Sequence, residues 1–202
     1  MKNLIGSYAI DFTAPAVLSD GSIINDFNLY NNIDGVYSLL FFYPMDFTFV
    51  CPSELIALNN RLNEFNKRNV KIIAISIDSQ YVHKAWRNVP IELGGIGNDI
   101  KFTLVSDIKK VIMSSYGLED LKSGVSFRGS IIIDDKKLVR IQHVHDFPIG
   151  RNIDEYIRIF DALIFNSQYG NVCPAGWTKG NSGMVASPDG VKKFLSSNYD
   201  KL

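Results

Sequence analysis

Apolar runs typical of buried strands alternate along this chain with patterns typical of amphipathic helices. The run at 38–43 is followed by a helical pattern at 52–67. The run VKIIAISID at 70–78 is followed by a helical pattern through Lys84 and Trp86. Regular alternation of this kind predicts an α/β fold in which helices cover the faces of a sheet.

The second half of the chain continues the alternation and adds a hairpin. KFTLVSD predicts a further strand, and the segment after it predicts an amphipathic helix. SIIIDDKKLVRIQHV places the polar turn 134–137 between two β-rich runs, which predicts antiparallel strands and therefore a mixed sheet. Asn152, followed by Glu155, opens a long helical pattern with the spacing of a capping box. The helix after KFTLVSD would bury Ile108, Val111, Ile112 and Tyr116.

Length and charge narrow the class of protein. With 202 residues and 46% hydrophobic content, the chain is long enough for one well-buried domain. The formal net charge is zero, so no excess of basic residues points to nucleic acid or an anionic membrane as a partner. The N-terminal sequence has no apolar stretch of signal-peptide length, and no run approaches the roughly 20 residues that span a bilayer. We therefore expect a cytoplasmic protein, where two cysteines are transiently redox-active or unrelated.

Cys51 is the first candidate for chemistry because it lies where an apolar strand gives way to a helical pattern. Pro52 suits the first turn of a helix, so the thiol would meet unpaired N-terminal amides, which favour the nucleophilic thiolate. Position alone favours a different interpretation, namely a small buried core residue. The polar residues around it in an otherwise apolar stretch favour a reactive thiol: Asp46, Thr48, Ser53 and Glu54.

Pro44, Thr48 and Cys51, within FFYP and FTFVCPSEL, match the signature of the peroxiredoxins. Further matching segments are spread over the whole chain: IGSYAIDFTAPAV, SIDSQYVHKAW, HDFPIGRNIDE and NVCPAGW. A match of this extent is more specific than one short motif. The chain resembles a typical 2-Cys peroxiredoxin, which implies a thioredoxin-like fold with a mixed central sheet flanked by helices and an extended C-terminal tail.

The resemblance also implies roles for individual residues. Arg128, in SFRGSIII, would stabilise the thiolate and polarise the peroxide, a task for which a permanently charged guanidinium is suited. Thr48 would present its hydroxyl to the peroxide oxygens, and Pro44 would shield the pocket from water. Glu54 would orient the arginines, of which Arg151 is the second. Taken alone, Arg128 is compatible with a surface ion pair, and Glu54 with a first-turn acid that only stabilises a helix dipole.

The composition changes after Gly170, where glycine, serine, asparagine, proline and lysine become frequent. This predicts a peroxidase domain at 1–169 and a mobile tail at 170–202. Cys173 lies in the tail, far along the chain from Cys51, so any contact between them must come from the fold or from a second subunit. Alternatively, Cys173 is an incidental surface thiol with no role in the chemistry. The resemblance implies a resolving cysteine that acts on the Cys51 of a partner chain.

The activity implied by the resemblance is thiol-dependent reduction of hydrogen peroxide and alkyl hydroperoxides. It would proceed through a Cys51 sulfenic acid and an intersubunit disulfide with Cys173. Because the chain has no CxxC pair, thioredoxin or a flavoprotein disulfide reductase would recycle it. The family further implies a homodimer that assembles into a decamer. Two alternatives stay open: a holdase chaperone or redox relay, and a thioredoxin-like binding module with inert cysteines.

The remaining motifs favour neither a metal nor a cofactor. His143 and His145 share one face of a predicted strand, but a zinc site would need further ligands near them. The glycines of GGIG at 94–97 do not follow a strand and open a helix as a dinucleotide fingerprint does. By resemblance, this segment and the pair Phe194 and Leu195 would pack over the helix of Cys51. Such packing would slow unfolding of the helix and expose the sulfenic acid to overoxidation.

Overall fold

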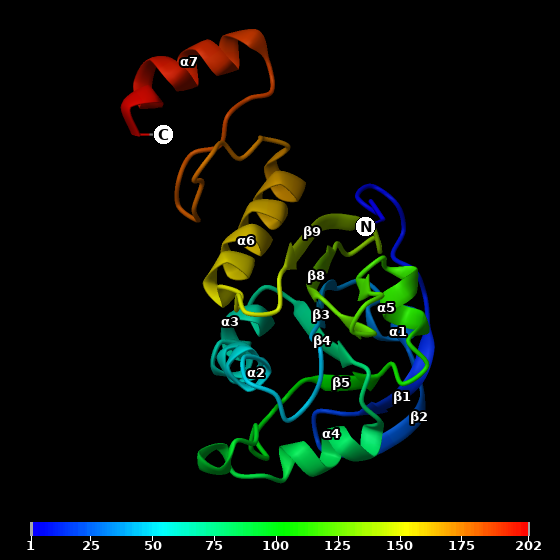
Figure 1. Ribbon diagram of the computed structural model, residues 1–202. Helices are drawn as coiled ribbons and strands as arrows, with labels where there is room; N and C mark the ends of the chain where they lie inside the picture. Colours follow the sequence, from blue (N-terminus) through cyan, green and yellow to red (C-terminus); the bar gives the residue numbers. More distant parts are fainter. Residues whose placement is uncertain (1, 202) are drawn as a thin grey trace. The chain divides into compact units, whose positions relative to one another are not determined.

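The computed structural model describes residues 2–201. Its contacts divide the chain into two units, Met1–Ile153 and Asp154–Leu202. The first unit contains a seven-stranded sheet with the strand order β2-β1-β5-β4-β3-β8-β9, in which β3, β4 and β5 run parallel (Figure 1). Its strands are β1 (Thr13–Val17), β2 (Ile23–Asn28), β3 (Tyr37–Phe42), β4 (Val70–Ser76), β5 (Thr103–Ser106), β8 (Arg128–Ile133) and β9 (Val139–His145). A separate small ladder joins β6 (Glu119–Asp120) to β7 (Val125–Ser126).

The sheet is mixed, as the sequence predicts. β8 pairs antiparallel with β3 and β9 with β8, while β1 pairs antiparallel with both β5 and β2. The inner strands are buried on both faces, which explains why their sequences are nearly continuous apolar runs. One face of the sheet carries Leu40, Ile73 and Val105 in the main hydrophobic cluster.

Helices of the first unit are short and are interspersed with the strands. Ser79 caps α4 by accepting a hydrogen bond of 3.3 Å from the amide of Val82, and Asn28 caps α1 through the amide of Asn31. Such caps satisfy amides that have no partner within the helix. The helices are α1 (Leu29–Asn32), α2 (Cys51–Asn60), α3 (Leu62–Asn66), α4 (Gln80–Arg87), the 3₁₀ turn η1 (Ile91–Leu93) and α5 (Val111–Ser115).

The helical pattern at 52–67 is divided into two helices. Arg61 leaves helical geometry, with φ of −106° and ψ of 7°, and its amide donates to the carbonyl of Leu58. This bond closes a tighter turn than the regular α-helical pattern. Asn59 and Asn60 precede the break, and asparagine is a weak helix former. The helix that begins at Cys51 therefore ends after ten residues.

The predicted helix after β5 is shorter than its apolar pattern. The Asp107 carboxylate accepts hydrogen bonds from the amides of Ile112 and Met113, at 3.0 and 2.7 Å. These bonds hold the chain ahead of α5 in a turn. As a result, α5 does not begin until Val111. Of the four predicted core positions, Ile112 and Tyr116 are buried, whereas Ile108 and Val111 are exposed.

The hairpin of β8 and β9 forms as predicted around the polar turn. The side chain of Asp134 accepts hydrogen bonds from the amides of Lys136 and Leu138 at 3.0 and 2.9 Å. Lys137 adopts a positive φ of 65°. β8 begins at Arg128, so the hairpin sets the position of that side chain at one end of the sheet.

The second unit contains α6 (Ile153–Tyr169, most of which lies in this unit), α7 (Pro188–Asn198) and the turn η2 (Tyr199–Lys201). Ser187 caps α7 through the amide of Gly190, and Pro188 occupies its first turn. The segment predicted as a tail thus contains a regular helix, and the boundary predicted at 169/170 falls within the second unit. None of the helices in residues 2–201 is long and apolar enough to cross a membrane.

Candidate active site

Cys51 is the first residue of α2 and its side chain is fully buried. The loop 43–50 connects it to the carboxyl end of β3. Val50, at the N-cap position, makes no side-chain hydrogen bond to the helix, and Pro52 lies in the first turn. Cys51 therefore lies at the positive end of the helix dipole, which stabilises negative charge.

Arg128 brings a permanent positive charge to the thiol. Its Nη1 atom lies 3.4 Å from Cys51 Sγ, and the same atom donates a hydrogen bond of 2.8 Å to Glu54 Oε2. Its Nε atom donates to the carbonyl of Phe147 at 2.7 Å. The side chain of Arg128 is almost entirely buried, so water screens its charge little. An anionic sulfur at Cys51 would gain a charge-assisted hydrogen bond.

Arg151 also binds the carboxylate of Glu54, through both its side chain and its backbone amide. Its Nε and Nη2 atoms donate to Oε1 and Oε2 at 2.9 and 3.0 Å, and its backbone amide donates to Oε1 at 2.9 Å. Nη1 donates to the Gly129 carbonyl and the Ser130 hydroxyl. The guanidinium carbon lies 3.2 Å from the ring centre of Phe41. This array fixes the carboxylate that in turn fixes Arg128.

The environment of Glu54 favours its charged form. Burial raises the pKa of this carboxyl, but the hydrogen bonds and charge of Arg151, together with the charge of Arg128, outweigh burial and bring the pKa below its ordinary value of 4.5. Two arginines and one carboxylate leave the cluster with a net positive charge. Arg128 is the member of the cluster that brings this positive charge next to the sulfur of Cys51.

A cavity of about 530 Å³ opens beside Arg128. Thr48 and Pro44 form part of its wall, and the Thr48 hydroxyl donates a hydrogen bond of 2.8 Å to the Met45 carbonyl. Most of the other lining side chains are apolar, so the cavity suits a substrate with one polar, reactive end. The remaining lining residues are Phe49, Val50, Ser123, Val125, Phe147 and Pro148.

Cys173 belongs to the second unit and has its own surroundings there. Its half-buried Sγ atom lies 3.5 Å from the carbonyl of Ala162 in α6. Burial raises the pKa of this thiol, and the charge of Arg158 lowers it by less. Arg158 also donates to the Trp177 carbonyl at 2.8 Å and thereby ties the chain after Cys173 to α6. Both cysteines are free thiols.

The structure thus brings together four of the seven residues singled out in the sequence: Cys51, Glu54, Arg128 and Arg151. Thr48 and Pro44 join them through the cavity that Arg128 also lines. Cys173 is described only within the second unit. Among residues 2–201, no three histidine, cysteine, aspartate or glutamate side chains are grouped as a metal ion would require.

A buried polar cluster beneath the loop 43–50 was not anticipated from the sequence. The Tyr43 hydroxyl donates to Asp46 Oδ1 at 2.7 Å, and His83 Nδ1 lies 2.8 Å from Asp46 Oδ2. The Asp46 amide donates to Asp78, which ties the loop to the end of β4. Burial raises the pKa of Asp46 more than the contacts with His83 and Tyr43 lower it. The signal available in the sequence was Asp46, a charged residue within an apolar stretch.

Comparisons with known proteins identify the family of the chain. Residues 5–142 match the AhpC/TSA family, and residues 162–197 match the C-terminal domain of 1-Cys peroxiredoxin. The chain is 50% identical over 196 residues to alkyl hydroperoxide reductase C of Buchnera aphidicola subsp. Schizaphis graminum, covering 97% of this chain and 98% of that protein. It is 44% identical over 195 residues to peroxiredoxin-1 of Gallus gallus, covering 96% of each. The solved structure of reduced Plasmodium vivax 2-Cys peroxiredoxin superposes with a TM-score of 0.92 at 44% identity, covering 96% of this chain and 100% of that one.

Proposed function

The chain belongs to the AhpC/TSA family and is a peroxiredoxin, that is, a thiol-dependent peroxidase with a thioredoxin-like fold. On this basis we propose that Cys51 is the residue that peroxide oxidises. The observation that carries this assignment is the 3.4 Å approach of Arg128 Nη1 to Cys51 Sγ at the start of α2. A thiolate is the nucleophilic form of cysteine, and both the guanidinium and the helix dipole favour it.

In the proposed reaction, the Cys51 thiolate attacks the terminal oxygen of a hydroperoxide. The O–O bond breaks, the electron pair goes to the departing oxygen, and that oxygen takes a proton to leave as an alcohol or as water. Cys51 becomes a sulfenic acid. Arg128 stabilises the negative charge that moves from sulfur to oxygen, and the Thr48 hydroxyl donates to or accepts from the peroxide. Pro44 and the apolar cavity wall keep water from the reacting atoms.

The second step is the condensation of the sulfenic acid with Cys173 of a partner chain. The Cys173 sulfur attacks the Cys51 sulfur, a disulfide forms, and the hydroxyl leaves as water. Because these two are the only cysteines of the chain, an external dithiol must reduce the disulfide. We assign that role to thioredoxin or a flavoprotein disulfide reductase. The working assembly is a homodimer that forms a decamer, in the cytoplasm, with a peroxidase domain at 1–169 and a resolving tail at 170–202.

The substrates are hydrogen peroxide and alkyl hydroperoxides. The names of the bacterial relatives include alkyl hydroperoxide, and the cavity beside Arg128 has room and apolar surface for an alkyl group. Small substrates would use only the polar end of the cavity, near Thr48 and Arg128.

A non-reducing gel tests the cysteine assignments. The reduced protein is treated with one equivalent of hydrogen peroxide as wild type, Cys51→Ser and Cys173→Ser. We expect a covalent dimer in the wild type that is lost in both variants, together with peroxide turnover when a dithiol is supplied. A wild-type chain that consumes peroxide but stays monomeric would reject the role of Cys173. A chain that consumes none would point to one of the non-enzymatic alternatives.

A further inference from the structure

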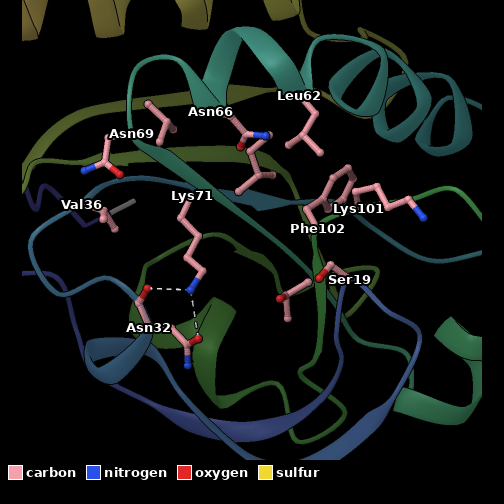
Figure 2. A pocket seen from close by; sticks show the side chains of 12 residues that line it. Ser19, Asn32, Val36, Leu62, Asn66, Asn69, Lys71, Lys101 and Phe102 are labelled. Carbon is pink, nitrogen blue, oxygen red and sulfur yellow. Dashed lines mark hydrogen bonds between the residues drawn. The ribbon is translucent and has the colours of Figure 1, made fainter.

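A second cavity of the first unit, with a volume of about 320 Å³, lies at the amino-terminal ends of β4 and β5 (Figure 2). Lys71 is the second residue of β4 and Thr103 is the first residue of β5. Because β3, β4 and β5 are parallel and Cys51 follows the carboxyl end of β3, this cavity lies at the opposite end of the sheet from the thiol. A ligand bound here would leave the peroxide site open.

The residues that line this cavity include two lysines, Lys71 and Lys101, and no acidic side chain. The Lys71 ammonium donates to the carbonyl and side-chain oxygens of Asn32, at 3.0 and 3.2 Å. An ammonium has three protons, so one is left for a ligand. Partial burial lowers the pKa of Lys71, and among the described residues no carboxylate forms an ion pair with it.

Neutral donors in the same cavity are also available. Neither the Asn66 carboxamide nor the Thr103 hydroxyl has a hydrogen-bond partner within residues 2–201 that would compete for it. Thr103 is 7% exposed, and Ser38 and Ser106, not Thr103, carry the buried hydroxyls without a partner among the described residues, so the Thr103 hydroxyl keeps access to solvent. A ligand with acceptor oxygens would therefore replace water at these two donors.

Lys101 supplies a second, movable charge. Its ammonium lies 3.6 Å from Asp99, and both side chains are mostly exposed, so this ion pair holds it weakly. Figure 2 shows Lys71 turned toward Asn32, whereas Lys101 extends away from Lys71. A long lysine side chain can turn toward an anion at small cost once one is bound.

We propose that this cavity binds a small phosphate monoester, with the phosphate held by Lys71 and the rest of the molecule against Asn66 and Thr103. A phosphate presents several acceptor oxygens, which match the ammonium, carboxamide and hydroxyl donors. Lysine binds phosphate as a point charge, whereas a carboxylate is better matched by the fork of an arginine. The volume lies at the lower end of the range for ligand cavities, which favours a ligand of few atoms.

The test is calorimetric titration of the full chain with glycerol 3-phosphate and with inorganic phosphate, at constant ionic strength. Glycerol and sodium chloride are the matched controls. We expect the ester to bind with a Kd of about 1 mM or tighter and to raise the unfolding temperature. Lys71→Gln should weaken binding about tenfold or more, since a hydrogen bond to a charged group is lost. Thr103→Val should weaken it by less.

Lys109→Gln is the control variant, because it removes the same charge from an exposed position that does not line the cavity. It should bind the ester as the wild type does. Peroxide turnover should stay unchanged in all three variants, which also shows that each is folded. The proposal is overturned if Lys71→Gln binds as tightly as Lys109→Gln, or if sodium chloride gives the same thermal shift as the ester. Since the peroxide site is not involved, these outcomes do not depend on the role of Cys51.

Discussion

The nitrogen of Arg128 that lies 3.4 Å from the sulfur of Cys51 is the same atom that donates to Glu54 at 2.8 Å. The thiol and the carboxylate therefore share one donor, and the position of the guanidinium beside the sulfur depends on Glu54. Since Glu54 lies three residues after Cys51 on α2, the helix sets the distance between the two acceptors.

Replacing Glu54 by glutamine should destabilise the fold strongly. The substitution leaves two buried guanidinium groups without a carboxylate, and breaking a buried ion pair in this way costs about 3–5 kcal/mol. The free energy of unfolding is to be measured in urea at fixed protein concentration. Glu64→Gln is the control, because Glu64 forms a surface pair with Lys67. If both variants lose equal stability, the buried cluster does not stabilise the fold as described.

Acid should remove the contribution of Glu54 to stability. Its pKa in the folded chain lies below the ordinary value of 4.5, so the unfolded chain binds the proton more tightly. The stabilisation is complete above about pH 5 and is lost progressively as the pH falls through the folded pKa. We expect the free energy of unfolding to fall less steeply with acid in Glu54→Gln than in the wild type. Parallel pH profiles of the two proteins would contradict this.

Arg128→Gln should slow both the alkylation of Cys51 at mildly acidic pH and the reaction with peroxide. Loss of one donor to a developing charge typically costs a factor of about 10² in rate. The rates of the Arg128→Lys variant should lie between those of the wild type and of Arg128→Gln, because an ammonium keeps the positive charge but lacks the forked donors of a guanidinium. Stopped-flow measurements in a Cys173→Ser background isolate the first step. Lys136→Gln removes an exposed charge from the hairpin turn and should react at the wild-type rate.

The hydroxyl of Thr48 can be tested by a pair of substitutions. Thr48→Val keeps the shape of the side chain but removes the hydrogen bond to Met45 and any bond to the peroxide. Thr48→Ser keeps the hydroxyl. We expect the peroxide rate constant to fall about tenfold or more in the valine variant and to be largely retained in the serine variant. Equal rates in the two variants would exclude a role for the hydroxyl.

Deletion of the C-terminal helix should make the enzyme more resistant to high peroxide. By the family resemblance, Phe194 and Leu195 would pack over the helix of Cys51 and slow its unfolding. Both lie in α7, which begins at Pro188 and is capped by Ser187, so removal of 188–202 takes away the whole helix. The concentration of peroxide that inactivates the enzyme during turnover is the measurement. Lys193→Gln, an exposed change within α7, serves as the control. An unchanged inactivation curve after deletion would reject the idea.

The inner strands were predictable because each is a continuous apolar run buried on both faces. β1 was not, and its sequence explains why. Pro15 interrupts the strand, cannot donate to a ladder and coincides with a register shift between Ala14 and Ala16. Short strands with such an irregularity carry no clear periodic signal. The hairpin partner, β2, mixes apolar and polar residues without strict alternation.

The candidate active site was likewise predictable only in part from the local sequence. The position of Cys51 at a helix start followed from the local sequence, since a strand, a proline and a helical pattern meet there. The convergence of Arg128 and Arg151 on Glu54 did not, because it joins α2 to β8 and to the chain beyond β9. Local patterns give no information about contacts of such long sequence separation, and the residues alone were compatible with surface roles. Family resemblance supplied that part of the prediction.

The break at Arg61 has a consequence for hydrogen exchange. At ten residues, α2 is shorter than the 12–15 residues that an isolated helix needs to persist in water. Its protection must come from the packing of Leu55 and Leu58 and from the Glu54 cluster, and the break prevents the ladder of α3 from extending it. The amides of α2 should therefore exchange together, as one cooperative opening separate from that of β4. The thiol then sits on a unit whose opening free energy can be tuned by a few side chains while the sheet remains closed.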